Sequence, residues 1–477
     1  MRRFLVSAAH KSSGKTTVAV GLAAALTARG RTVQTFKKGP DYIDPMWLTQ
    51  ASGRRCRNLD PYLSTEAEIR EAFARHAAGA DVALVEGNKG LYDGLALDGS
   101  NSNAAVARML DLPVALVIDA RGMTRGIAPL ILGYQAFERD IRIAGVILNQ
   151  LGGSRHEAKL RAVIEHYTDV PVLGAVHHDP RLAIVERHLG LMPSNEAGDA
   201  AAHVAQIGAA IAAQVDLDRL LAVAGDTPAV AAPTLPARAA AADIRIGIAR
   251  DRAFGFYYAD DLDALAAAGA TLVGFDTLAD THLPDVDALV IGGGFPELFA
   301  RELEANAALR ERIRRAIDAG LPVYAECGGL MYLARSLTHA GHTCRMVGAI
   351  DGDVVMHERP VGRGYVVLDE TAEFPWPRQA EDTAGVRAHE FHYASLENLP
   401  ADTRFAYRVR RGHGVDGERD GIVTRNVLAS FVHRRCTDRS NWAARFAAFV
   451  RASGCGQRRA ANAAWVDPAR AGEALVV

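Results

Sequence analysis

The chain has 477 residues, of which 49% are hydrophobic, and its formal net charge is −2 at pH 7. This length exceeds what one core supports, so we expect two or three domains. The near-zero charge gives no electrostatic case for nucleic acid or an anionic membrane as a partner. No apolar run approaches the roughly 20 residues of a membrane span. The five scattered cysteines suit a reducing compartment, and we therefore expect a cytoplasmic protein.

The N-terminal segment has the pattern of a phosphate-binding loop. Residues 4–8 form an apolar, β-leaning run, and residues 18–26 carry apolar residues at helical spacing. Between them stands Ala9-His10-Lys11-Ser12-Ser13-Gly14-Lys15-Thr16-Thr17, with Ala9 where a first glycine is expected. A strand, a tight loop and a helix N-terminus create an anion site, in which Lys15 reaches the β/γ-phosphates and Thr16 binds Mg²⁺. We predict an ATP site at Gly14, Lys15, Thr16 and Thr17, the alternative being an ordinary helix cap.

A second strand is expected at residues 32–36, followed by an irregular loop over residues 37–45, because Gly39, Pro40 and Pro45 disfavour regular structure. This loop carries Asp41 and Asp44. Two carboxylates beside a phosphate site can hold Mg²⁺ and position a reacting group. The alternative is that both aspartates only form turns.

Further buried strands are expected at residues 81–85, 113–119, 143–149 and 171–175, with helical stretches between them. Alternation of apolar strands with helices predicts a doubly wound parallel sheet covered on both faces. Glu86 and Asn149 follow strand ends, where the ligand crevice of such a sheet lies. Glu86 is therefore a second candidate for Mg²⁺, and Asn149 is expected to contact the nucleotide base unless it is only a turn residue. The histidines at 177, 178 and 188 match no zinc-site spacing.

The composition changes near residue 222, where a segment rich in alanine and proline begins. We read residues 223–243 as a linker between an N-terminal domain of residues 1–222 and a second α/β domain of residues 244–450. Residues 451–477 show little apolar periodicity and are expected to form an irregular tail.

The second domain carries the residues of a thiol-dependent reaction. Three glycines at residues 292–294 follow a strand and let backbone N–H groups converge, as an oxyanion hole requires. Cys327 lies on a sharp turn from a strand into a helix, next to Gly328, which exposes a nucleophile and lowers its pKa. His433, after the strand-like run at residues 427–432, is the expected base. A buried packing cysteine is the alternative.

With these residues in place, the chain resembles the cobyrinic acid a,c-diamide synthase family from the phosphate loop to about residue 450. The motifs that carry the resemblance occur in order along both domains. They are Gly14-Lys15-Thr16-Thr17, Gly39-Pro40-Asp41-Tyr42-Ile43-Asp44-Pro45, Gly90-Leu91-Tyr92-Asp93-Gly94, Glu186-Arg187-His188-Leu189-Gly190, Gly292-Gly293-Gly294-Phe295-Pro296-Glu297, Glu326-Cys327-Gly328-Gly329-Leu330 and His389-Glu390-Phe391-His392-Tyr393.

The resemblance implies a carbon–nitrogen ligase of cobalamin biosynthesis with an N-terminal synthetase domain and a C-terminal, flavodoxin-like class I glutamine amidotransferase domain. ATP and Mg²⁺ would phosphorylate the a and c acetate carboxylates of a tetrapyrrole, and ammonia from glutamine would displace the phosphate from the acyl phosphate. The implied roles are nucleotide and metal binding for Lys15 and Thr16, metal binding and carboxylate activation for Asp41, Asp44 and Glu86, glutaminase catalysis for Cys327 and His433, and oxyanion or glutamine contacts for Gly293, Gly294 and Gly328.

The chain departs from the family pattern at Lys38 and at Asn88-Lys89, where apolar residues are usual. Both departures lie in loops implied to face the substrate, together with Tyr42 and Tyr92. Lys37, Lys38 and Lys89 flank the loops that carry Asp41, Asp44 and Glu86 and are cations suited to ring carboxylates, the alternative being solvated surface lysines. A sirohaem-type ring is an alternative substrate. The sequence His433-Arg434-Arg435 also lacks the glutamate that many class I glutaminases carry two residues after the histidine.

Two other classes compete with the ligase. A nucleotide-switched partition or metallocentre-insertion ATPase shares the first domain's fold, but typically has a lysine where this chain has His10 and has no use for Cys327. A tetrapyrrole carrier with inactive sites would not need Lys15, Thr16 and Cys327. A homodimer is one of the assemblies that the sequence leaves open.

Overall fold

The computed structural model describes residues 1–187, 190–225, 242–378 and 385–454. The chain forms two compact units, Met1–Leu235 and Pro236–Val477. Most of the expected linker, the tail from residue 455 and His188 lie outside the described residues, so the domain boundaries stay predictions. At the edges of these segments, helix α8 (Leu217–Ala224) continues two residues past 222, and helix α13 (Trp442–Ala452) continues two residues past 450.

The first unit is built on a seven-stranded sheet in which every neighbouring pair is parallel. This confirms the predicted doubly wound α/β fold. In spatial order the strands are β3 (Arg57–Leu59), β2 (Val33–Lys38), β4 (Val82–Glu86), β1 (Arg2–Ala8), β5 (Val114–Asp119), β6 (Ile143–Leu151) and β7 (Val172–His177). Because the strands are parallel, the segments that follow β1, β2 and β4 meet at one edge of the sheet.

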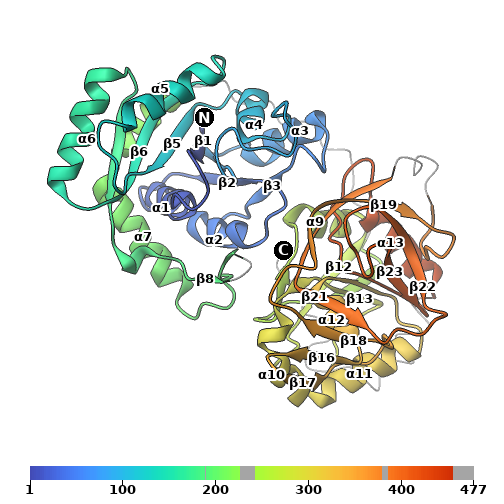
Figure 1. Cartoon of the computed structure of the whole chain (residues 1–477). Helices are drawn as coiled ribbons and strands as arrows, with labels where there is room; N and C mark the ends of the chain where they lie inside the picture. The colour runs from blue at the N-terminus through green and yellow to red at the C-terminus, as the bar shows by residue number, and fades with distance from the viewer. Residues whose placement is uncertain (188–189, 226–241, 379–384, 455–477) are drawn as a thin grey trace. The chain divides into compact units, whose positions relative to one another are not determined.

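Helices cover both faces of this sheet (Figure 1). On one face α1 (Lys15–Ala28) packs against α2 (Ile43–Ser52) and α7 (Ala200–Gln214), and α8 contacts β1 and β6. The apolar core of the other face receives side chains such as Phe73, Val106, Ile131 and Ile164. These come in turn from α3 (Glu66–Ala77), α4 (Asn103–Leu110), α5 (Ile127–Phe137) and α6 (Ser154–Tyr167).

The expectation of an irregular loop over residues 37–45 is wrong at both ends. Lys37 and Lys38 complete strand β2, and Asp44 and Pro45 lie in the first turn of α2. Proline is tolerated there, because the N–H groups of the first helical turn have no partner within the helix. Only residues 39–42 remain irregular, and Gly39 adopts φ +91° there.

The second unit contains a nine-stranded mixed sheet. Its parallel part consists of β12 (Ala270–Phe275), β10 (Ile244–Ala249), β13 (Ala288–Ile291), β15 (Val323–Glu326) and β24 (Val427–Ser430). An antiparallel extension continues from β24 through β23 (Arg419–Thr424), β22 (Arg404–Arg411), β19 (Gly362–Glu370) and β20 (Val386–His392). Strand β24 therefore joins the two parts, and the chain continues from it to His433.

Two apolar cores cover this sheet. One receives α10 (Ala300–Ala305), α11 (Ala307–Asp318) and α12 (Gly328–Leu333), and the other receives α9 (Ala259–Ala267) and α13. A smaller sheet of β17 (His342–Arg345), β16 (Ser336–His339), β18 (Asp353–Met356) and β21 (Ala394–Glu397) joins the first core. A two-stranded sheet pairs β11 (Phe254–Phe256) with β14 (Gly293–Gly294) beside the catalytic cysteine candidate.

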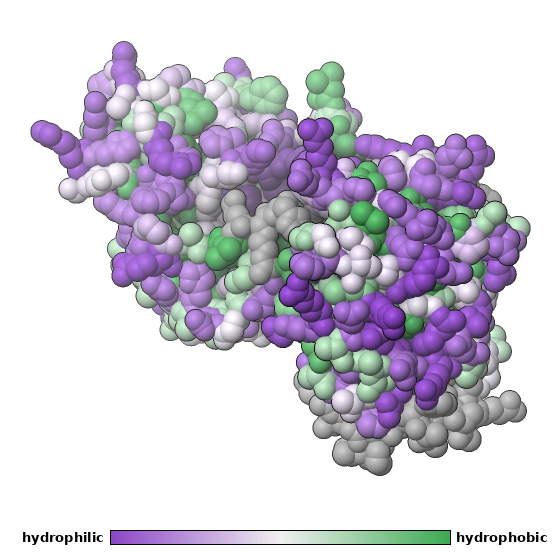
Figure 2. Space-filling view, turned by 60° about the horizontal axis from the view of Figure 1, so that its bottom comes forward, coloured by the Kyte–Doolittle hydropathy of each residue, from purple (hydrophilic) through white to green (hydrophobic). Residues whose placement is uncertain are grey.

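The surface is mostly polar on the face shown in Figure 2, where hydrophobic residues occur in small scattered groups between hydrophilic ones. Among the described residues, the model contains no helix with the length and hydrophobicity that crossing a membrane requires.

Candidate active sites

The predicted phosphate loop runs from the end of β1 into α1. Gly14 caps the helix with φ +77°, in the left-handed region. A Cβ atom at this position would lie 2.1 Å from Nδ2 of Asn149, so both the backbone and the available space require glycine. The Asn149 amide donates a hydrogen bond to the Ser13 carbonyl at 2.9 Å. Asn149 thus braces the loop, and its predicted contact with a base stays a prediction.

Carboxylates gather at the mouth of this loop. Lys15 Nζ lies 2.8 Å from Glu86 Oε1, and the Thr16 hydroxyl donates to the same oxygen at 2.6 Å. Thr16 Oγ1 is also 3.2 Å from Asp44 Oδ2. The structure therefore brings together the predicted Lys15, Thr16, Asp44 and Glu86 from three separate segments, while Thr17 follows within α1.

The sequence predicts Lys37 as a possible contact for ring carboxylates but does not place it at the phosphate loop. Lys37 is fully buried, and its ammonium pairs closely with Asp44 and lies 3.1 Å from Glu86 Oε1 and 3.8 Å from Asp41 Oδ2. Burial alone lowers the pKa of Lys37, but the three carboxylates outweigh it and raise that pKa. Burial also opposes ionisation of Asp44, yet Lys37 and Lys15 hold its pKa below the usual range. The site thus combines two cations, Lys15 and Lys37, with three acids, Asp41, Asp44 and Glu86.

Asp41 is the more accessible acid of this set, with one third of its side chain exposed. Its Oδ1 accepts hydrogen bonds from the backbone N–H groups of Ile43 and Asp44 at 2.9 and 3.0 Å. Desolvation and the neighbouring Asp44 carboxylate raise the pKa of Asp41. This aspartate therefore both initiates α2 and offers a second oxygen to a ligand.

The substrate-loop predictions separate into buried and exposed residues. Lys38 is buried and donates to the Asn101 carbonyl at 2.5 Å and to Asn88 Oδ1 at 3.3 Å, and burial lowers its pKa to about 8. This placement favours a structural role for Lys38. Lys89 is exposed and adopts φ +44°. Of the two lysines, only Lys89 is free of such burial, so we keep it as the candidate for a substrate contact.

Of the two tyrosines predicted to contact substrate, one is buried and the other is hydrogen-bonded within the first unit. Tyr42 is buried at the N-cap of α2. Tyr92 donates from its hydroxyl to the Tyr134 carbonyl at 2.6 Å, and the Tyr134 hydroxyl in turn donates to the Ala9 carbonyl in the phosphate loop. Tyr92 therefore connects its own loop to the phosphate loop through α5.

The second unit presents Cys327 between β15 and α12. Cys327 has φ +48° and ψ −103°, a sparsely populated conformation for a residue with a side chain. Its N–H donates to the Ser430 carbonyl of β24 at 2.7 Å. A strained residue at a strand-to-helix turn is the geometry expected of an exposed nucleophile, although Cys327 is largely covered here.

His433 lies beside this thiol, three residues beyond the end of β24. Burial alone lowers the pKa of His433, but Cys327 and Glu326 outweigh it and raise that pKa to about 10. A Cβ atom on Gly293 would lie 2.6 Å from His433 Cε1, and one on Gly328 would lie 3.1 Å from the Gly294 nitrogen. Gly293 thus lies against His433 and Gly328 packs against Gly294, while their role in an oxyanion hole stays a prediction.

His389 is a second residue that sequence analysis did not assign to the site. Its ring stacks on that of His433 at a centroid distance of 5.0 Å, and the two residues exchange backbone hydrogen bonds of 3.1 and 2.8 Å. Burial and the neighbouring His433 hold the pKa of His389 well below the usual range. A neutral ring therefore packs against one face of the His433 imidazole.

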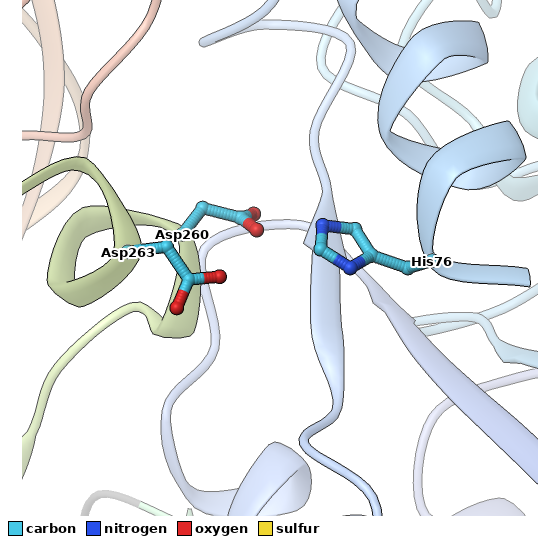
Figure 3. A group of neighbouring side chains, drawn as sticks. All are labelled: His76, Asp260 and Asp263. Carbon is cyan, nitrogen blue, oxygen red and sulfur yellow. The ribbon is translucent and has the colours of Figure 1, made fainter. Parts of the chain in front are cut away.

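Figure 3 shows another group of metal-ligand residue types, His76 with Asp260 and Asp263. The two aspartates lie on α9 of the second unit, whereas His76 lies on α3 of the first. Asp260 pairs with Arg435 at 2.9 Å. We assign no metal site to this group, because its residues belong to separate units.

The fold and the two sites define a glutamine-dependent amide ligase with a nucleotide-binding domain. Residues 5–191 match the family model "CobQ/CobB/MinD/ParA nucleotide binding domain", and residues 245–441 match "CobB/CobQ-like glutamine amidotransferase domain". The chain belongs to the cobyrinate a,c-diamide synthase family. It is 45% identical over 459 residues to the Magnetococcus marinus protein of that name, covering 95% of this chain and 98% of the relative.

Two further relatives have the same name. The Methanosarcina acetivorans protein is 43% identical, with 90% of this chain and 92% of the relative covered. The Listeria monocytogenes serotype 4b protein is 38% identical, with 91% and 96% covered. Family membership confirms the resemblance stated from the motifs and removes the reading as a nucleotide-switched ATPase.

Proposed function

We propose that this chain catalyses the ATP- and glutamine-dependent amidation of the a and c acetate carboxylates of cobyrinate, a step of cobalamin biosynthesis. The observation that carries the proposal is the identity of 45% over nearly the whole length of a relative named cobyrinate a,c-diamide synthase. The residues that we assign to both half-reactions are present in this chain. The shared name favours the cobyrinate ring over the sirohaem alternative.

The first unit supplies groups for carboxylate activation. A free carboxylate has no good leaving group, so transfer of the ATP γ-phosphoryl group to one acetate oxygen must come first and gives an acyl phosphate. Lys15, which pairs with Glu86, would neutralise charge on the phosphates, and Lys37 balances the carboxylates of Asp44 and Glu86. Substrate acetates are themselves anionic, so these buried cations reduce the repulsion among the reacting groups.

The residues present fit a Mg²⁺ ion. Glu86 Oε2 is buried and has no hydrogen-bond partner among the described residues, and the Thr16 hydroxyl and Asp44 lie beside the same carboxylate. Carboxylate and hydroxyl oxygens are the ligands that Mg²⁺ prefers. Thr16, Glu86 and the aspartates Asp41 and Asp44 would hold the ion, which supplies charge neutralisation for the phosphates when bound.

The second unit supplies ammonia. His433 accepts the Cys327 proton, and the thiolate attacks the side-chain amide carbon of glutamine to form a glutamyl thioester. The imidazolium returns its proton to the departing ammonia, and water then releases glutamate. Ammonia attacks the acyl phosphate, which yields the amide and inorganic phosphate. We also propose that the reaction is cytoplasmic, because Cys56, Cys327, Cys344 and Cys436 are free thiols.

The proposal is tested by supplying the protein with ATP, Mg²⁺ and glutamine together with cobyrinate or sirohaem, and following the products by mass spectrometry. We expect conversion of two cobyrinate carboxylates to amides, with phosphate and glutamate released in equal amounts. Amidation of sirohaem but not of cobyrinate would contradict the ring assignment. ATP hydrolysis without any amide product would contradict the ligase reaction itself.

Lys89 offers a separate prediction about ring binding. Replacing Lys89 by alanine should raise KM for cobyrinate about tenfold, because a hydrogen bond to a charged carboxylate contributes about 1.5–3 kcal/mol. The KM for ATP should stay within about twofold. Lys159 is an exposed lysine on α6, and Lys159→Ala serves as the matched control. An equal KM for cobyrinate in Lys89→Ala, Lys159→Ala and the unmodified protein would show that Lys89 does not contact the ring.

A further inference from the structure

Glu326 stands directly before the catalytic cysteine and faces the catalytic histidine. It is the last residue of β15, is buried, and brings Oε2 to 3.4 Å from Nδ1 of His433. Its other oxygen, Oε1, accepts hydrogen bonds from the Arg434 N–H at 2.9 Å and from the Tyr324 hydroxyl at 2.5 Å. The carboxylate is therefore fixed by two donors, with one oxygen left toward the imidazole.

The residue two positions after His433 does not supply a carboxylate. That position is Arg435, whose guanidinium lies 2.9 Å from Asp260 and 5.4 Å from the centre of the Tyr258 ring. The following residue, Cys436, donates its N–H to Asp261 at 2.8 Å. The segment after His433 is thus anchored to α9, and the acid that faces the histidine comes from β15 instead.

We propose that Glu326 is the positioning residue of the glutaminase site, orienting His433 and stabilising the imidazolium that forms when His433 takes the Cys327 proton. This inference rests on the glutaminase half of the proposed function. Because Nδ1 faces Glu326 Oε2 at 3.4 Å, Nε2 is the ring nitrogen left for the Cys327 thiol. The carboxylate would thereby favour one ring orientation and one tautomer, as the acid of a catalytic triad does.

The proton transfer from Cys327 to His433 conserves atoms and charge within the glutaminase site. The Cys327 S–H bond breaks, the proton binds to Nε2 of His433, and the positive ring faces the negative carboxylate while the thiolate attacks the amide carbon. Loss of ammonia returns the proton from the ring, so the step needs no proton transfer to Glu326. Without the carboxylate, the imidazolium would lie in a buried site with only the thiolate to compensate its charge, which disfavours the ion pair.

Several other titratable or charged groups lie near Glu326 and His433 and contribute to the pH dependence of this site. They are Cys327 at the start of α12, His389 on β20, Tyr324 on β15, Tyr257, Tyr258 and Asp261 at or near α9, and Arg434 and Cys436 after β24. Glu326 contacts the catalytic ring from the side of Nδ1, whereas His389 lies on its face. The two supports can therefore be separated by mutation.

The test measures alkylation of Cys327 by iodoacetamide as a function of pH, followed at that cysteine by peptide mass spectrometry. In Glu326→Gln we expect the alkylation rate at neutral pH to fall and its pH midpoint to move upward, because the thiolate loses the imidazolium that stabilises it. The kcat for glutamine hydrolysis should fall by about 10²-fold or more, with a smaller change in KM. Glu326→Asp, which keeps a carboxylate, should recover part of both. Glutamine in the variant retains an oxygen for Arg434 and Tyr324, which preserves the fold.

Asp420 provides the matched control for loss of a buried acid. It is fully buried and accepts hydrogen bonds from the Ser430 hydroxyl at 2.5 Å and from the Val432 N–H at 3.2 Å, so it braces the segment that leads to His433 without touching the ring. Asp420→Asn should leave the alkylation midpoint in place. An unchanged midpoint in Glu326→Gln, or an equal shift in Asp420→Asn, would overturn the inference. Amidation with ammonium should persist in Glu326→Gln. If the unmodified protein itself forms no amide with ammonium, that result would instead count against the proposed function.

Discussion

Replacing Cys327 by serine is expected to abolish glutamine-dependent amidation while amidation with a high concentration of ammonium continues near the rate of the unmodified protein. The serine hydroxyl is a far weaker nucleophile than a thiolate, and His433 lies close enough to Cys327 to accept the thiol proton. The fall in glutamine-dependent rate should be about 10³-fold or more. Ammonium replaces only the product of the second unit, so the chemistry of the first unit should be unaffected.

The measurement compares steady-state amide formation with glutamine and with ammonium, at saturating ATP and cobyrinate. Cys344 supplies the control, because it is also a buried free cysteine but lies on β17, away from the turn that carries Cys327. Cys344→Ser should retain both activities. If Cys327→Ser is folded but loses both the glutamine and the ammonium reaction, Cys327 is not simply the glutaminase nucleophile.

The parts of each site that follow one another in the chain could be predicted from the sequence. The phosphate loop and the cysteine turn are local patterns, in which a strand, a few small residues and a helix determine the geometry. Gly14, Lys15 and Thr16 therefore lie where the motif predicts, and the same holds for Cys327 and Gly328. The parallel sheet of the first unit also follows from alternating apolar strands and helices.

The parts that depend on pairing between distant segments could not be predicted in the same way. In the sequence, Lys37 is a cation beside a loop that could contact ring carboxylates. Only the parallel pairing of β2 with β4, which sets Lys37 beside Glu86, shows it among three carboxylates. His389 likewise reaches His433 through one antiparallel bridge between distant segments. In the second unit, the antiparallel extension beyond β24 gave only short apolar runs in the sequence. A signal for Lys37 was present, since adjacent strands of a doubly wound sheet end at one edge.

Lys15→Ala is expected to remove most of the synthetase activity, whether nitrogen comes from glutamine or from ammonium. Lys15 Nζ pairs with Glu86 Oε1 at 2.8 Å, and 11% of the lysine side chain is exposed. Its ammonium is thus held at the predicted phosphate site. Removing one such preorganised donor costs about 10²–10³-fold in kcat.

The variant should leave the second unit intact, so the pH midpoint for alkylation of Cys327 provides an internal control for folding. A conservative comparison is Lys15→Arg, which keeps the charge but places a larger planar group in a space fitted to an ammonium, and should recover only part of the rate. The decisive measurement is ammonium-dependent amide formation at saturating ATP, because it removes any contribution from glutamine hydrolysis. If Lys15→Ala forms amide within about twofold of the unmodified rate, the loop does not act on the transferred phosphoryl group, and the cluster of Lys37, Asp44 and Glu86 must carry that charge alone.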